Sequence, residues 1–252
     1  MSTSIARRAV VTGGGGQIGA ATARMLADRG FAVGVLDQDG DAADAVAREI
    51  NAGGKPAIAL TAQTTELAQL QCARAEFEAE FGPATALVNI AGLPHAAAFD
   101  DLDPATWERV VAANLTGTVQ ATQVFAAGMR AAGFGRIVMM ATMSAVLANQ
   151  GQIAYGAAKG GVISLTSSLA VEFARDGVTV NAVCPGAVAT PAALAILTTE
   201  QRAERERRIP VGRLASPEDV AHAVGFLVAD ESSYINGLML YVDGGLHVAG
   251  IF

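Results

Sequence analysis

Short apolar runs alternate with longer segments of helical periodicity along the whole chain. The runs are rich in valine, isoleucine, leucine and alanine, and between them apolar residues recur every three or four positions. The pattern predicts strands at Ala9–Thr12, Ala32–Asp37, Ala57–Thr61, Ala86–Ile90, Arg136–Ala141, Thr179–Cys184 and Leu238–Val242. It predicts helices at Ile18–Arg29, Asp41–Ala52, Thr65–Phe81, Pro104–Arg130, Gln152–Asp176 and Pro217–Val228.

The order of these elements predicts an α/β fold. Continuous apolar strands joined by helices are typical of a parallel sheet that is covered on both faces. Because such crossovers are right-handed, we expect one doubly wound Rossmann-type domain over residues 1–252, with a seven-stranded sheet. The segment Pro191–Pro210 breaks the rhythm, first apolar and then rich in arginine. It is predicted to be a substrate-loop insertion, at about residues 190–210, that closes over a ligand.

Composition narrows the class of protein. The net charge of −7 argues against nucleic-acid and anionic-membrane partners. The N-terminus lacks the usual apolar signal region, and the longest mostly apolar stretch, Ile137–Ala148, is too short to span a bilayer. We therefore expect a cytoplasmic protein. Cys72 and Cys184 form no metal or redox spacing and are expected to be reduced and buried, and Trp107 is expected to pack in the core.

A glycine-rich turn follows the first strand, where the chain from Thr12 to Gly19 reads TGGGGQIG. Backbone N–H groups of such a turn can approach a pyrophosphate, and the dipole of the next helix favours its negative charge. Glycines also form ordinary tight turns. The position of this run between a strand and a helix favours dinucleotide binding.

Asp37 ends the second predicted strand, about twenty residues after the glycine-rich turn. A carboxylate there can accept hydrogen bonds from the adenosine ribose and repel a 2′-phosphate. Gln38 follows, where an NADP enzyme would profit from an arginine. The alternative is a solvated loop acid, since Asp39 and Asp41 lie beside it. The spacing favours the ribose contact, so NAD is the expected cofactor.

Tyr155 and Lys159 lie four residues apart in YGAAK, on one face of a predicted helix. Lys55 is the only other lysine of the chain. A phenol normally keeps its proton to about pH 10, and a cation beside it favours the phenolate. The pair is therefore predicted to exchange a proton near neutral pH, as alcohol oxidation and carbonyl reduction require.

Several motifs together resemble those of the short-chain dehydrogenase/reductase family over nearly the whole chain. They are the TGxxxxxG turn at Thr12–Gly19, NIAG at Asn89–Gly92, Asn114 in ANLTG, YxxxK at Tyr155 and Lys159, PGAVAT at Pro185–Thr190, and VDGG at Val242–Gly245. The resemblance implies an oxidoreductase acting on CH–OH groups. Its members usually form dimers or tetramers through their long helices, so a homotetramer, or else a homodimer, is expected.

The resemblance also implies catalytic roles. Tyr155 would be the acid or base at the substrate oxygen. Lys159 would hold the nicotinamide ribose and lower the pKa of the tyrosine, and Asn114 would position a water on the proton path. The family residue thirteen positions before the tyrosine hydrogen-bonds the substrate oxygen, and here that position is Thr142 in place of the usual serine. Ser144 remains an alternative partner.

Further positions are implied to contact the cofactor or the substrate. The cofactor residues are Gly13, Gln17, Ile18 and Gly19 at the pyrophosphate, Gln63 at the adenine, Asn89 and Gly92 near a ribose, and Pro185, Gly186, Val188 and Thr190 at the nicotinamide, together with Asp37, Tyr155 and Lys159. The substrate residues are Thr142, Ser144, Gln152 and Tyr155. Gln17 and Ile90 depart from the family pattern, which has a glycine and an asparagine there.

The expected pocket wall is mainly apolar. It comprises Leu93, Pro94, Met143, Val146, Leu147 and Pro191–Leu197, with Asn149 and Gln152 as polar contacts. Such a wall favours a small or medium apolar ketone, a cyclic alcohol or a diol. The alternatives are a 3-oxoacyl-(acyl-carrier-protein or CoA) reductase and a non-catalytic NAD(H)-binding sensor. His95 is expected to be a solvated loop histidine, and Arg202, Arg205, Arg207 and Arg208 a solvated helix face.

Overall fold

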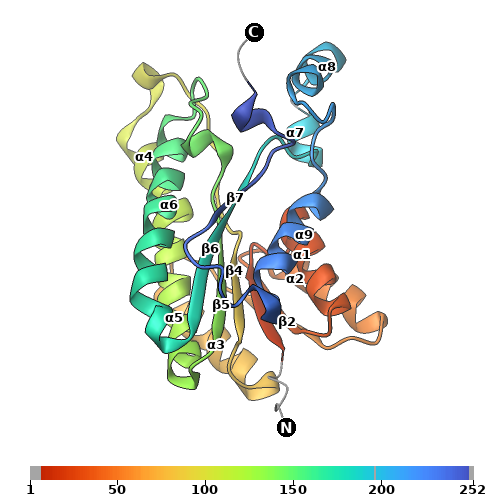
Figure 1. The fold of residues 1–252 in the computed structure, drawn as a ribbon, viewed down its shortest axis with the longest axis vertical. Helices are drawn as coiled ribbons and strands as arrows, with labels where there is room; N and C mark the ends of the chain where they lie inside the picture. The colour runs from red at the N-terminus through yellow and green to blue at the C-terminus, as the bar shows by residue number, and fades with distance from the viewer. Residues whose placement is uncertain (1–6, 196, 250–252) are drawn as a thin grey trace.

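A parallel sheet of seven strands forms the centre of the molecule (Figure 1). The computed structural model describes residues 7–195 and 197–249, so Ile196 of the predicted pocket segment lies outside it. The strands are β1 (Arg8–Thr12), β2 (Ala32–Asp37), β3 (Ala57–Thr61), β4 (Ala86–Asn89), β5 (Gly135–Met140), β6 (Val178–Pro185) and β7 (Met239–Val242). Their order is β3-β2-β1-β4-β5-β6-β7. All seven predicted strands are confirmed, with ends that differ by one residue at most.

Helices cover both faces of this sheet (Figure 1). One layer consists of α1 (Gln17–Asp28), α2 (Gly40–Ala52) and α9 (Pro217–Leu227). The other consists of α3 (Leu67–Phe81), α4 (Pro104–Val111), α5 (Gly117–Ala132) and α6 (Ile153–Phe173). The doubly wound Rossmann-type fold is therefore confirmed, with its strand order reversing at β1 and β4. Ligands of such sheets bind beyond the carboxyl ends of the strands at this reversal.

The apolar side chains of the strands pack into two separate hydrophobic cores, one on each face of the sheet. Successive side chains of a strand point to opposite faces. In β5, Ile137 and Met139 pack under α3, α5 and α6, whereas Val138 and Met140 pack under α1, α2 and α9. Burial on both faces is the reason that the strands read as continuous apolar runs.

The predicted helix Pro104–Arg130 is not continuous. α4 ends at Val111, a π-helical turn follows at Ala112–Thr116, and α5 begins at Gly117. Such turns widen the helix locally and occur often at functional sites. Here the turn contains Asn114, whose side chain is fully buried.

The expected insertion forms two helices above the carboxyl edge of the sheet, α7 (Pro191–Ala195) and α8 (Thr199–Arg208) (Figure 1). Thr198 and Gln201 cap α8 reciprocally, in the arrangement called a capping box. Arg202 bonds Glu206 at 2.9 Å, and Glu204 pairs with Arg207 and Arg208. The arginine run is therefore a solvated, ion-paired helix face, as expected.

Two expectations about buried side chains are wrong. Trp107 is 40% exposed on α4, because α4 turns this side of its first two turns to solvent. Cys72 is exposed on α3, whereas Cys184 is buried in β6, where burial raises the pKa of its thiol to about 11. None of the helices described has the length and the apolar character that crossing a bilayer requires.

Candidate active site

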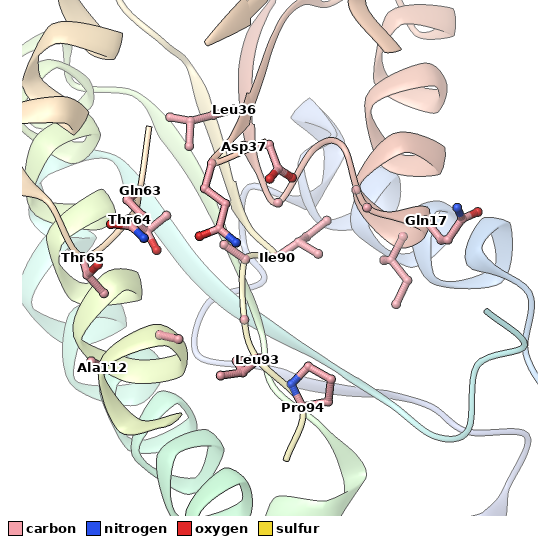
Figure 2. A pocket seen from close by; sticks show the side chains of 18 of the residues that line it. Gln17, Leu36, Asp37, Gln63, Thr64, Thr65, Ile90, Leu93, Pro94 and Ala112 are labelled. Carbon is pink, nitrogen blue, oxygen red and sulfur yellow. The ribbon is translucent and has the colours of Figure 1, made fainter. Parts of the chain in front are cut away.

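A cavity of about 1020 Å³ opens at the carboxyl edge of the sheet, at the strand-order reversal. Its walls come from the glycine-rich turn, the ends of β2 and β3, the loop after β4, the π-helical turn and the segment after β6. Figure 2 shows Asp37 and Gln63 from two of these walls, with Leu93 and Pro94 further along. The cavity has the place and the size that an extended dinucleotide requires.

Close backbone approach shapes the glycine-rich turn. Gly13 has φ +67°, which L side chains rarely adopt. A Cβ on Gly19 would lie 2.0 Å from the Gly13 carbonyl oxygen. Both positions therefore require glycine. Gln17 replaces the family glycine without a clash because it begins α1, and Figure 2 shows its side chain projecting away from Asp37 and Ile90.

Asp37 is held by two backbone groups. Its Oδ2 accepts a hydrogen bond from Gly15 N at 3.0 Å, and its Oδ1 accepts one from Asp39 N at 3.1 Å. The carboxylate is half-buried and lines the cavity beside Gln38. It is a positioned wall residue, and so the alternative of a freely solvated loop acid is not supported.

The cavity brings together most of the residues predicted to hold the cofactor. Those that line it are Gly13, Gln17, Ile18, Gly19, Asp37, Gln63, Gly92 and Thr190. Leu93, Pro94 and Ala192 of the expected pocket wall line it as well. Met143 is instead buried, and Val146 is exposed beyond the end of β5.

Asn89 does not line the cavity, although the next three residues do, and its expected position near a ribose stays a prediction. The side chain is buried and its Nδ2 donates to Thr122 Oγ1 at 3.0 Å, because β4 directs it toward α5. Thr12 ties this region to β1, since its Oγ1 accepts from Ile90 N at 3.1 Å and from Ala91 N at 3.2 Å. The loop after Asn89 therefore faces the cavity with Ile90, Ala91 and Gly92.

Three predicted residues on the nicotinamide side also lie outside the lining of this cavity. Pro185 is the last residue of β6. Gly186 packs against Asp243, where a Cβ would come within 2.9 Å of the aspartate Cβ. Val188 forms a parallel bridge with Ala215. These three residues belong to the segment that leads from β6 to Thr190, and Thr190 itself lines the cavity.

Asn114 joins α4 to the loop after β4. Its Nδ2 donates to Leu93 O at 2.8 Å and to Val110 O at 2.9 Å, and its Oδ1 accepts from Leu93 N at 3.2 Å. A Cβ on Gly92 would lie 2.5 Å from Asn114 Oδ1 and 3.4 Å from Lys159 Nζ. Asn114 and Lys159 thus both lie beside Gly92, which lines the cavity.

Tyr155 and Lys159 lie together on α6, as their spacing predicts. Lys159 Nζ is 5.9 Å from the centre of the Tyr155 ring and donates to Met140 O at 2.8 Å. Burial lowers the pKa of Lys159 to about 8. Burial also raises the pKa of Tyr155, although a hydrogen bond with Thr142 lowers it in part. The expected lowering of the tyrosine pKa by Lys159 is therefore wrong for this structure, because desolvation is the larger effect.

The structure separates the two candidate hydroxyl partners. Thr142 is buried and is the hydroxyl that lowers the pKa of Tyr155 in part, and its Oγ1 accepts from Ser144 N at 3.2 Å. The Ser144 hydroxyl accepts instead from Asn149 Nδ2 at 2.8 Å. Asn149 also reaches Gln152 Oε1 at 3.4 Å. Of the two hydroxyls, the geometry favours Thr142 as the one beside the phenol.

Known proteins match this chain over nearly its full length. A family model described as enoyl-(acyl carrier protein) reductase matches residues 15–247. Cis-4-hydroxycyclohexanecarboxylate dehydrogenase of Sinomonas cyclohexanicum is 41% identical, over 95% of this chain and 96% of its own. Acetoacetyl-CoA reductase of Rhizobium meliloti is 38% identical, over 97% and 100%. A crystal structure of a single-site variant of actinorhodin polyketide ketoreductase with NADPH has a TM-score of 0.92 at 33% identity, over 99% and 100%.

The chain belongs to the short-chain dehydrogenase/reductase family. Its fold, the match of the family model and the curated relatives agree on this. The protein is accordingly an oxidoreductase.

The sequence did not single out every lining residue of this dehydrogenase/reductase. Thr64 and Thr65 line the cavity after β3, and Ala112 and Ala113 line it from the π-helical turn. Arg109 lines it from α4. It precedes Ala112 and Ala113 by three and four residues, so helical spacing places it on the same helix face as these two lining residues. His95 also lines the cavity from the loop after β4 and is half-buried, and its expected role as a solvated loop histidine stays a prediction.

Lys159→Met should stabilise the protein at pH 7. Because burial holds the folded pKa of Lys159 near 8, against 10.5 for an exposed lysine, the folded chain carries a buried cation at a cost of about 3 kcal/mol below pH 8. Removing the charge should raise the free energy of unfolding by about 1–3 kcal/mol, after the loss of the Met140 hydrogen bond.

Urea unfolding at several pH values measures this effect. Between pH 8 and 10.5 the unfolded chain binds more protons at this lysine, so wild-type stability should gain a rising contribution that the variant lacks. A Lys159→Met protein less stable than wild type at pH 7 would contradict the prediction.

Proposed function

We propose that the protein is an NAD(H)-dependent dehydrogenase that interconverts a secondary alcohol and a ketone, with Tyr155 as the acid and base. The observation that carries this proposal is the grouping of Tyr155 with Thr142 and with Lys159 one helical turn away, where Lys159 lies beside Gly92 of the dinucleotide-sized cavity. Two neighbouring hydroxyls can share a third oxygen, that of the substrate.

The residues present fit a nicotinamide dinucleotide. Gly13 and Gly19 leave the backbone bare at the start of α1, where a pyrophosphate would bind, and Asp37 offers carboxylate oxygens to a ribose. A 2′-phosphate would meet the negative charge of Asp37 with only Gln38 beside it. The chemistry that a bound nicotinamide would supply is hydride transfer, and its positive charge in the oxidised form would lower the pKa of the phenol.

The roles of the side chains follow from their contacts. As phenolate, Tyr155 would remove the proton of the alcohol, and as phenol it would return a proton to the ketone. Thr142 would donate to the substrate oxygen and orient it. Lys159 would hold the nicotinamide ribose once it leaves Met140 O, and Asn114 would position a water that links Lys159 to solvent.

An acyl-thioester reductase is the second candidate, because a relative is named acetoacetyl-CoA reductase. A basic surface for an acidic carrier protein is less well supported. Arg130 is bonded to Asp176 at 2.6 Å and lies 4.5 Å from the ring centre of Phe173, so it is already engaged. The assembled Tyr155 and Thr142 pair counts against a non-catalytic sensor.

The proposal extends to assembly and location. A homotetramer, with a homodimer as the alternative, would use the outer surfaces of α4, α5 and α6. Support comes from apolar side chains left exposed there, Trp107 at 40% and Val171 at 81%. We propose a cytoplasmic enzyme whose single domain comprises both the cofactor and the substrate site.

A screen of secondary alcohols with NAD, followed by NADH absorbance, tests the proposed function. Cyclohexanol and 4-hydroxycyclohexanecarboxylate belong in the panel because of the relative from Sinomonas cyclohexanicum. Oxidation should favour NAD over NADP by roughly 10²-fold in kcat/KM, since like charges in contact cost several kcal/mol. Asp37→Asn keeps an oxygen for Gly15 N and removes the charge, so the preference should fall about tenfold. Equal use of both cofactors by the wild type would refute the assignment of Asp37.

A further inference from the structure

Asp243 is a buried carboxylate that the proposed chemistry does not use. It follows β7 directly, in the VDGG motif, and its side chain is only 2% exposed. No lysine or arginine in the described part of the chain forms an ion pair with it. A buried carboxylate without a cation needs hydrogen-bond donors, because desolvation disfavours its charge. The donors of Asp243 therefore show which segment this carboxylate holds in place.

The donors come from the C-terminal turn, residues 243–248. Oδ1 of Asp243 accepts from Gly245 N at 3.0 Å, and Oδ2 accepts from His247 N at 2.7 Å and lies 2.8 Å from His247 Nδ1. Because a carboxylate oxygen can only accept, Nδ1 of the imidazole carries the proton and donates it. The ring of His247 also stacks on Tyr241 of β7, with ring centres 4.1 Å apart. Asp243 and His247 thus fix the C-terminal turn against β7.

The chain that follows α8 packs against this turn. Val211 N donates to Gly244 O at 3.2 Å. Gly244 has φ +65°, and a Cβ on it would lie 2.7 Å from Ile209 Cγ2. A Cβ on Gly245 would lie 3.4 Å from Pro210 Cγ. The bare backbone of the turn therefore lies against the three residues after α8, and Figure 1 shows the C-terminal turn at the same edge of the sheet as α7 and α8.

The chain before α7 is held at a different place. Val188 forms its bridge with Ala215, and Ala189 N donates to Ala215 O at 2.8 Å. Thr190 and Ala192, just beyond that bridge, line the cavity. Neither α7 nor α8 has a buried residue in the part that the structure describes. The position of the two helices therefore depends on the chain at their two ends, and the downstream end lies on the C-terminal turn.

We propose that His247 is a positioning residue that anchors the downstream end of α8 through Asp243. The pair keeps the C-terminal turn in the conformation against which residues 209–211 pack, and so fixes α8 over the carboxyl edge of the sheet. Ligands of doubly wound sheets bind at that edge. The inference rests on the proposed function only for its effect on the substrate, while the anchor itself stands on the contacts of the turn.

The pair also has a simpler possible role, which is to end β7. Aspartates commonly close turns by accepting hydrogen bonds from backbone N–H groups that follow them. That role predicts that loss of the His247 side chain loosens residues 243–249 alone. The anchor predicts that the change reaches residues 209–212, which are distant in sequence. His222 on α9 provides the matched control, since it is exposed and forms no hydrogen bond or ion pair within the described ranges.

Hydrogen exchange of the full-length protein tests the anchor without turnover. His247→Leu should speed exchange of the Val211 and Gly212 amides about tenfold, the effect of one lost hydrogen bond to a charged group, and should leave the amides of β1 and β4 at wild-type rates. His222→Leu should match wild type. Unchanged exchange at Val211 and Gly212 in His247→Leu would overturn the proposal, and so would equal acceleration in β1 and β4, which would indicate global unfolding.

His247→Asn is the rescue variant. Its side-chain amide places an N–H as many bonds from the backbone as Nδ1 of the imidazole, so the donor to Asp243 is kept while the aromatic ring is lost. Exchange at Val211 and Gly212 should return close to the wild-type rate. Exchange as fast as in His247→Leu would show that the bond to Asp243 is not the anchor.

Kinetics separate the anchor from the proposed function. His247→Leu should raise KM for the alcohol about tenfold at nearly unchanged kcat and NADH affinity, because Tyr155 and the glycine-rich turn belong to other segments. His247→Asn should recover the wild-type KM. An unchanged KM in active His247→Leu would overturn the positioning role. Absence of alcohol oxidation by the wild type, with the exchange difference intact, would reject the proposed function and keep the anchor.

Discussion

Tyr155→Phe is expected to reduce turnover by roughly 10²- to 10⁴-fold, the usual contribution of a positioned acid or base, while NADH affinity stays nearly unchanged. The substitution removes one oxygen, that of the phenol, and keeps the ring that lies beside Lys159. Steady-state kinetics of alcohol oxidation and NADH fluorescence titration measure the two quantities. Retention of substantial activity would defeat the assignment of Tyr155.

The pH profile gives a second test of the same residue. Burial raises the pKa of Tyr155, so its phenolate fraction in the free enzyme is small at neutral pH and grows as the pH rises. Oxidation by wild type should therefore increase with pH in kcat/KM, and the residual activity of Tyr155→Phe should not follow this rise. Tyr234→Phe is the matched control, since that tyrosine is fully exposed and should behave as wild type.

Gly19→Ala is expected to abolish NADH binding and to destabilise the fold by about 3 kcal/mol or more, at or beyond the upper end of overpacking effects. The new Cβ would lie 2.0 Å from Gly13 O and 2.8 Å from Gly14 Cα, and both are backbone atoms that no rotamer change can move. The turn must therefore open, and its N–H groups would no longer point to a pyrophosphate. Thermal unfolding and NADH titration report the two effects.

Gly160→Ala makes the same change inside α6 and serves as the control. A Cβ there would meet no described atom within 4 Å, so stability should stay the same or rise by about 0.4–1 kcal/mol. If Gly19→Ala bound NADH like wild type, the turn would be adaptable, and close approach could not explain its glycines.

Local patterns determined much of the architecture before any contact was known. The strand runs and the glycine-rich turn follow from side-chain chemistry over a few neighbouring residues, and the structure places each of them within one residue of its expected position. The juxtaposition of Tyr155 and Lys159 belongs to the same class, because one helical turn brings residues four apart together. Asp37 was identified as a candidate cofactor residue from its position about twenty residues after the glycine-rich turn.

Contacts between distant segments needed the tertiary structure. Asn89 follows the family motif in sequence, but β4 turns its side chain toward Thr122 in the core. The preference of Tyr155 for Thr142 over Ser144 depends on the short helix after β5, which leads Ser144 to Asn149. Arg109 lines the same cavity as Asp37 and Gly13 only because α4 brings it there.

The sequence by itself determined the fold, the family and the proximity of Tyr155 and Lys159 in this dehydrogenase/reductase, since each depends on periodicity or short spacing. The tertiary structure decided which polar groups face the cavity and how burial changes their ionisation. Desolvation depends on every atom packed around a group, from all parts of the chain. For that reason no local pattern could show that Lys159 has its pKa near 8 or that the pKa of Tyr155 is raised.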